Sequence, residues 1–110
     1  MDPALVAMAS QLRISASAAG LQLSALRYSA QDGFTAQAPG ATLIVFGSPA
    51  DAQATLADVT GAAPAVSPAS VARGARIQVE AASAILTRLA RTGASASVID
   101  VRWGAHPYYR

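Results

Sequence analysis

A turn at Gly47 and Ser48 carries the residue types that could bind a small anion. It lies between an apolar run at residues 43–46 and a helix expected to begin at Ser48. The free N–H groups at the start of a helix that follows a strand can hold a phosphate or a carboxylate. Pro49 removes one of these donors, and the Gly-rich dinucleotide and Walker patterns are both missing. We interpret Ser48 first as a helix cap and keep anion or nucleotide binding at Gly47 and Ser48 as an alternative.

The other side chains that could do chemistry are dispersed along the chain. Asp51 and Asp58 share a face of the expected helix, and paired carboxylates can act as general acid and base, but Asp51 is already explained as a capping residue. His106 is the single histidine, and no cysteine is present to join it in a metal site. No serine lies in a Gly-x-Ser-x-Gly elbow. The residues therefore predict a protein that is not an enzyme and has no metal and no cofactor.

Size and composition indicate one folded domain, residues 1–110. Of the 110 residues, 53% are hydrophobic and 13% charged, which is enough apolar content for a core. The eight basic residues are all arginine, spread from Arg13 to Arg110, and the net charge is only +2. Because nucleic-acid-binding surfaces concentrate cations on one face, we expect no nucleic-acid partner. The longest uncharged stretch, residues 33–50, is interrupted by Gly and Pro, so we expect no membrane span, and the acidic N-terminus predicts no secretory signal.

The first part of the chain predicts a helix followed by a hairpin. Asp2 followed by proline is a helix start, and apolar residues then recur at three- and four-residue steps up to Gly20. Residues 21–29 and 34–38 are separated by a Gln-Asp-Gly sequence that ends at Gly33 and favours a tight turn. We therefore expect two paired antiparallel strands here.

The middle of the chain predicts a buried strand, a helix and a loop. The continuous apolar run at residues 43–46 is typical of a strand in the core. Ser48 and Asp51 form a capping box for a helix that ends near Gly61. Residues 62–74 contain prolines and small residues without a period, which predicts a flexible loop.

The last part predicts a strand, a short helix, a second strand and a tail. Apolar and polar residues alternate at 75–81, which indicates a strand with one solvated face carrying Arg76, Gln78 and Glu80. A short helix follows up to Gly93, then a strand at 97–103 and an aromatic tail at 104–110. The order of these elements favours an α+β two-layer sandwich of ferredoxin-like architecture, with the helices packed on one face of a mostly antiparallel sheet.

The aromatic C-terminal region is the candidate interaction surface. Its residue mix is the one enriched at interaction hot spots, and the alternative is that Trp103 anchors the last strand in the core. The candidate interface residues are Ile99, Val101, Trp103, Tyr108 and Tyr109.

Two stretches give the chain a resemblance to a known family. Residues 12–38 resemble the periplasmic domains of the type II secretion L and M proteins and of their type IV pilus N and O relatives, in which a helix ending at a Gly-Leu pair, here Gly20-Leu21, runs into a hairpin. Residues 75–81, followed by 85–89 and 98–101, are similar to that family's strand, helix and return strand. The Pro- and Ala-rich insert at residues 62–72 and the aromatic tail depart from the family pattern.

The resemblance implies a non-catalytic assembly domain. It would lie at the periplasmic face of the inner membrane, in a secretion or pilus platform, and would bind a second copy of itself or a paralogous platform protein. Exposed strand edges or helix faces would make the contacts. Two alternatives stay open: a parallel three-stranded module that binds a small anion at Gly47 and Ser48, and a phage or virion protein that assembles into a ring.

Overall fold

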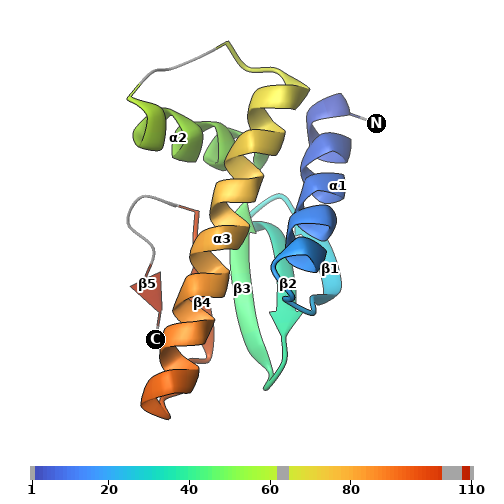
Figure 1. Cartoon of the computed structure of the whole chain (residues 1–110). Coiled ribbons are helices and arrows are strands. Elements are labelled where there is room, and N and C mark those ends of the chain that lie inside the picture. Colours follow the sequence, from blue (N-terminus) through green and yellow to red (C-terminus); the bar gives the residue numbers. More distant parts are fainter. Residues whose placement is uncertain (1, 62–64, 103–107, 110) are drawn as a thin grey trace.

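The computed structural model describes residues 2–61 and 65–102, and the backbone of residues 108–109. Helices and strands follow one another along the chain as drawn in Figure 1. In chain order the elements are α1 (Pro3–Ala18), β1 (Ser24–Ser29), β2 (Gly33–Ala38), β3 (Thr42–Gly47), α2 (Pro49–Thr60), α3 (Pro68–Thr92), β4 (Val98–Asp100) and β5 (Tyr108–Tyr109).

The strands form one mixed sheet in the order β1-β2-β3-β4-β5. The pairs β1–β2, β2–β3 and β4–β5 are antiparallel, whereas β3 and β4 are parallel neighbours. The chain passes through both α2 and α3 between these two parallel strands. The fold is therefore α+β, with the predicted predominance of antiparallel pairing.

The helices pack on the sheet and on one another. α3 lies across the sheet between α1 and α2 and packs against both (Figure 1). The core lies between this layer and the sheet, because apolar side chains of α1, α3 and the central strands all point into it. Its largest fully buried apolar side chains are Met8, Leu12, Ile44, Phe46, Leu56, Val71, Val79, Ile99 and Val101.

The helix starts predicted at Asp2 and Ser48 and the hairpin are confirmed, whereas the short helix predicted before Gly93 is the last part of the longer helix α3. Asp2 caps α1 by accepting a hydrogen bond from the backbone N–H of Ala4 at 2.9 Å. β1 and β2 form the expected antiparallel hairpin, with Tyr28 opposite Phe34. Gly61, with a φ of 72°, ends α2 in the left-handed conformation that favours glycine.

The strand predicted at residues 75–81 is wrong, because these residues lie inside the 25-residue helix α3. The helix begins at Pro68 behind a Ser67–Ser70 capping box, so residues 68–74 of the predicted loop are helical as well. Gln78, expected on a solvated strand face, is fully buried. The buried residues of α3 follow helical spacing, and this period overrides the short alternation: Ser70, Val71, Gly74, Ala75, Gln78, Val79, Ala82 and Leu89.

The strand expected at residues 97–103 is shorter in the structure. β4 covers only Val98–Asp100, and a turn follows at Arg102. Trp103 and residues 104–107 and 110 of the predicted tail, like residues 62–64 of the predicted loop, lie outside the described residues. Within the described part of the chain, each helix is too short or too polar to cross a lipid bilayer.

Candidate functional site

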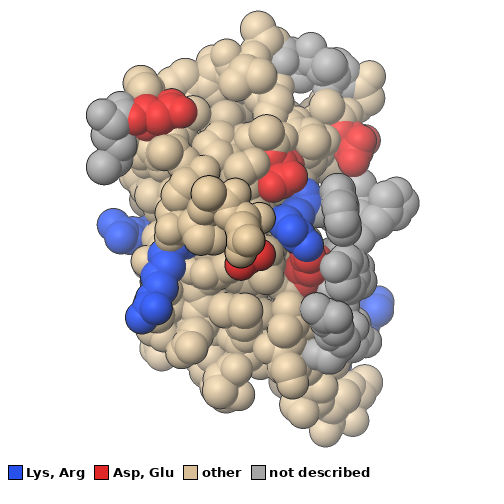
Figure 2. All heavy atoms as spheres, turned by 180° about the vertical axis from the view of Figure 1, so that it is seen from behind, with Lys and Arg blue, Asp and Glu red and all other residues tan. Residues whose placement is uncertain are grey.

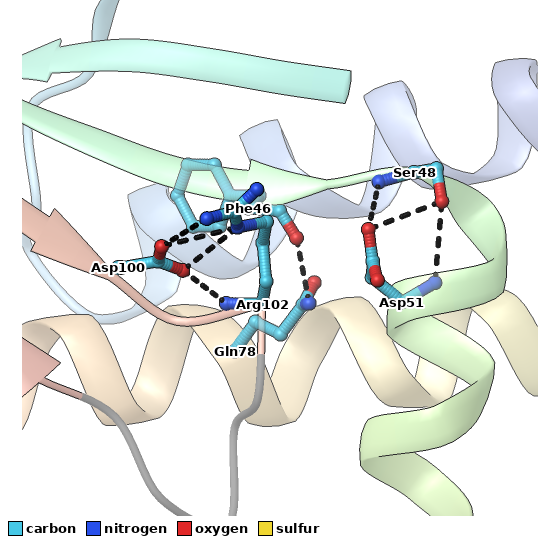
Figure 3. A network of polar contacts seen from close by, with 6 residues as sticks. All are labelled: Phe46, Ser48, Asp51, Gln78, Asp100 and Arg102. Atoms are coloured by element: carbon cyan, nitrogen blue, oxygen red, sulfur yellow. Dashed lines mark hydrogen bonds and ion pairs between the residues drawn. The ribbon is translucent and has the colours of Figure 1, made fainter. Parts of the chain in front are cut away.

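Polar side chains gather where the parallel strands β3 and β4 end side by side. Val45 pairs with Asp100, so the turn at Gly47 and Ser48 lies near the residues that follow β4. Ligands of open α/β sheets commonly bind at the carboxyl ends of parallel strands. Figure 3 shows this cluster, to which β3, α2, α3 and the end of β4 all contribute. Its hydrogen bonds decide whether a ligand could use it.

The turn at Ser48 is occupied by a carboxylate from the same chain. The backbone N–H and the hydroxyl of Ser48 both donate to Oδ2 of Asp51, at 2.8 and 3.1 Å. The N–H of Asp51 donates back to the Ser48 hydroxyl at 3.3 Å, which completes the predicted capping box (Figure 3). Pro49 has no N–H to offer. Asp51 therefore takes the position that an external anion would need at Gly47 and Ser48.

Asp100 and Arg102 form a partly buried ion pair beside this turn. Nη2 of Arg102 lies 2.6 Å from Oδ2 of Asp100, and Nε donates to both carboxylate oxygens at 3.1 Å. The Arg102 backbone N–H also donates to Oδ1 at 3.0 Å. The side chain of Asp100 is only 4% exposed and that of Arg102 30%. Two-point, charge-assisted bonds of this kind hold the chain as it leaves the sheet.

Gln78 reaches this cluster from α3. Its Nε2 donates to the carbonyl oxygen of Phe46 at 2.8 Å and so ties the long helix to the end of β3 (Figure 3). Its Oε1 is buried and has no hydrogen-bond partner among the described residues. In the same part of the chain, His, Cys, Asp and Glu side chains form no group of three that could hold a metal ion. The cluster thus links β3, β4, α2 and α3 through hydrogen bonds among its own residues.

The predicted interface residues fall into two groups. Ile99 and Val101 are fully buried and pack in the core, which corrects their expected place at an interface. Trp103 lies outside the described residues. Tyr108 and Tyr109 form the short strand β5, whose backbone pairs with Asp100 and Ile99 of β4.

An apolar groove runs between α1 and β1. It has a volume of about 760 Å³. The side chains of Val6, Ile14 and Tyr28, all on its walls, are 48%, 60% and 48% exposed. Tyr28 is held in place by an edge-to-face contact with Phe34, with ring centroids 5.0 Å apart. The groove is lined by Leu5, Val6, Ala9, Ser10, Arg13, Ile14, Leu26, Arg27, Tyr28 and Phe34.

Charged residues are few around this groove and on the face of the molecule seen from behind in Figure 2. Arg13 and Arg27 are the charged residues in the lining, and both are positive. Figure 2 shows the face opposite to that of Figure 1, where charged side chains are scattered among uncharged surface. Contiguous apolar surface on a small domain marks an interaction site more often than isolated apolar residues do. The groove is therefore the stronger candidate functional site.

The sequence contains a pattern that indicates this groove, but the buried stripe of α1 is the more obvious apolar pattern of the helix. Met8 and Leu12 belong to the buried stripe of α1, whereas Val6 and Ile14 lie outside it. Two large β-branched side chains on the exposed side of an amphipathic helix indicate a second apolar face. Their proximity to Tyr28 could not be predicted, because it depends on how α1 packs over the hairpin.

Comparisons with family models, with curated proteins and with solved structures find no significant match to this chain.

Proposed function

We propose that this protein is a non-catalytic interaction domain that works in the assembly of a larger structure. The observation that carries the proposal is the gathering of Val6, Ile14 and Tyr28, each about half exposed, along one groove. Fully burying a side chain of this size contributes about 1.5–3 kcal/mol, so covering the exposed half of each adds roughly 1 kcal/mol to a complex. A partner that fills the groove gains this energy from surface that the folded chain leaves in water.

The resemblance suggests where such a domain would act. We place it at the periplasmic face of the inner membrane, in a type II secretion or type IV pilus platform, bound to a second copy or to a paralogous platform protein. The order of a helix, the Gly20-Leu21 pair and a hairpin supports this, since α1 ends at Ala18, just before the pair, and β1 follows it. The helical state of residues 75–81 removes the support that this segment gave. The observed α+β fold supports only the broad fold class of that family. The ferredoxin-like architecture is therefore part of the proposal.

The two rival functions make different demands on the chain. Anion or nucleotide binding at Gly47 and Ser48 needs donors that Asp51 already uses. A ring-forming phage or virion protein would use an apolar surface of the same kind, but its contacts would be head-to-tail and would close into a ring. The stoichiometry of the assembly separates this alternative from a platform domain.

A pairwise interaction assay tests the proposal. The chain is measured against itself and against the periplasmic domains of platform proteins encoded beside it, with Ile14→Gln as the groove variant and Val59→Gln as a control on α2, where Val59 is 54% exposed. We expect at least one association that Ile14→Gln weakens and Val59→Gln leaves unchanged. Lack of association with every one of these partners would contradict the proposal.

A further inference from the structure

The groove-facing side of α1 is close to symmetric about its own midpoint. Small residues, Ala9 and Ser10, lie at the centre, and larger apolar residues, Leu5 and Ile14, lie at either end. A two-fold axis between Ala9 and Ser10 relates Leu5 to Ile14, which are both large and apolar, and relates Val6 to Arg13, where the residue types differ. Small side chains at the axis allow two helices to approach closely, and the larger side chains then pack on either side.

Charge favours an antiparallel arrangement of two such helices. Asp2 and Arg13 are exposed and lie 11 residues apart, about 20° from one another around the helix, so they share this face. In an antiparallel pair, each Asp2 lies about 6 Å along the helix axis from the partner's position 13, within reach of an Arg side chain. The two copies of Arg13 are then about 10 Å apart along the axis, so each Asp2 lies closer to the partner's Arg13 than the two copies of Arg13 lie to each other.

The edge of the sheet beside the groove disfavours an added strand as the occupant. β1 is an edge strand, but its pairing register shifts between Ser24 and Arg27. Ala25 has a φ of 54°, which is unusual for a residue with a side chain. Such a bulge interrupts the regular row of backbone donors and acceptors that a new strand would need. A helix that fills the groove uses side-chain contacts and does not need this edge.

We propose that the groove of each copy receives the α1 helix of a second copy, antiparallel to its own, to form a two-fold symmetric dimer. This inference rests on the proposed function, because it names the partner of the same surface. Each α1 lies against the other and over the partner's hairpin, where the exposed ring of Tyr28 covers it. The contact is mutual, so the exposed apolar residues of both grooves are buried in one interface.

Engineered cysteines test this geometry directly, because the chain has none of its own. Ser10→Cys places a thiol beside the two-fold axis, so mild oxidation should cross-link two copies through a single disulfide. Val6→Cys places its two thiols about 10 Å apart along the helix axis, beyond disulfide reach, and should not cross-link. Val59→Cys, exposed on α2, is the control for random collision. Cross-linking of Val6→Cys as readily as Ser10→Cys would indicate parallel helices and overturn the proposal.

Sedimentation of the cysteine-free chain supplies the second readout. We expect a dimer that Ile14→Gln dissociates and Val59→Gln does not. Asp2→Ser keeps a helix-capping side chain but removes the charge, and Arg13→Gln removes the opposite charge. We expect the effect of the two substitutions together on the dimer dissociation constant to differ from the product of their separate effects by about two- to five-fold. Within one copy these residues are about 16 Å apart along the helix, so this coupling must act between copies.

The failures of the two proposals are distinguishable. A chain that stays monomeric at high concentration, but binds a platform domain in a way that Ile14→Gln weakens, overturns the dimer and leaves the proposed function intact. A closed ring of more than two copies also overturns the dimer. Association with neither a second copy nor a platform domain removes both.

Discussion

Gly74 of α3 lies directly against the carbonyl group of Ala52 in α2. Both residues are buried, and a methyl group placed on Gly74 would overlap the carbonyl oxygen and carbon of Ala52. The obstacle is backbone rather than the end of a flexible side chain. The crossing of α2 over α3 therefore requires the absence of a side chain at this position.

We predict that Gly74→Ala destabilises the protein, although alanine is the better helix former. The substitution gains roughly 1 kcal/mol in an unobstructed helix, whereas overpacking of a closely packed site costs about 1–3 kcal/mol. Because the Ala52 backbone cannot move aside without shifting α2, we expect the cost to exceed the gain, with a net loss of up to about 2 kcal/mol in the free energy of unfolding, measured in urea. Ala84→Gly, at an exposed site on the same helix, is the control and should lose about 1 kcal/mol. A more stable Gly74→Ala variant would show that the two helices separate easily.

Local signals in the sequence predicted most element boundaries correctly. Asp2 and Ser48 each cap a helix as expected, and Gly61 ends α2 in the left-handed conformation. These features depend on residues within one turn of each other, so they need no knowledge of the tertiary fold. The hairpin around Gly33 is of the same kind.

Residues 75–81 show where local reasoning failed. Ile77 and Val79 favour a strand, and Gly74 weakens a helix, so the short window indicated alternation. The helical period appears only over the whole span from Val71 to Leu89. The candidate site was missed for a related reason, since Tyr28 and Ile14 belong to one groove only after α1 has packed beside the hairpin.

The buried amide of Gln78 leads to a second prediction. Gln78→Glu removes the donor to the Phe46 carbonyl oxygen and places a carboxylate where the side chain is fully buried. We expect a loss of more than about 2 kcal/mol in the free energy of unfolding at pH 7. Burial favours the neutral carboxyl group, so the folded state of this variant binds a proton more tightly than the unfolded state. Its deficit relative to wild type should therefore shrink as the pH falls from 7 towards 4.

Urea unfolding at several pH values measures this effect. Gln78→Leu lacks both the donor and the titratable group, so its deficit should not change with pH beyond that of the wild type. A pH-independent deficit in Gln78→Glu would mean that the new carboxylate escapes to solvent and that the middle of α3 packs more loosely against β3 than the structure indicates.

The ion pair between Asp100 and Arg102 should contribute far more to stability than the exposed pair on α3. Asp100→Asn removes the carboxylate charge that accepts the Arg102 guanidinium bonds in a largely buried setting. Breaking a fully buried pair costs about 3–5 kcal/mol, and because Arg102 is 30% exposed we expect about 1–3 kcal/mol here. Glu80→Gln breaks the pair of Arg76 and Glu80, whose side chains are 62% and 64% exposed, and should cost less than about 0.5 kcal/mol. Similar losses in the two variants would contradict this ranking.

The last prediction concerns the Asp51 carboxylate, which occupies the start of its own helix in place of an external anion. Its carboxylate accepts the Ser48 backbone N–H and hydroxyl, so added phosphate has to displace a group held on the same turn. A site with a dissociation constant of about 0.1 mM would stabilise the protein by about 2.7 kcal/mol in 10 mM phosphate. We expect no such rise in the melting temperature of the wild type, measured against chloride at equal ionic strength. Asp51→Ala removes the carboxylate of the capping box, so its free energy of unfolding should fall by about 0.5–2 kcal/mol. Phosphate should restore part of this loss, because the Ser48 donor is then open. Stabilisation of the wild type by phosphate, equal to that of Asp51→Ala, would show that the turn binds an external anion after all and would bring the anion-binding function ahead of the assembly role.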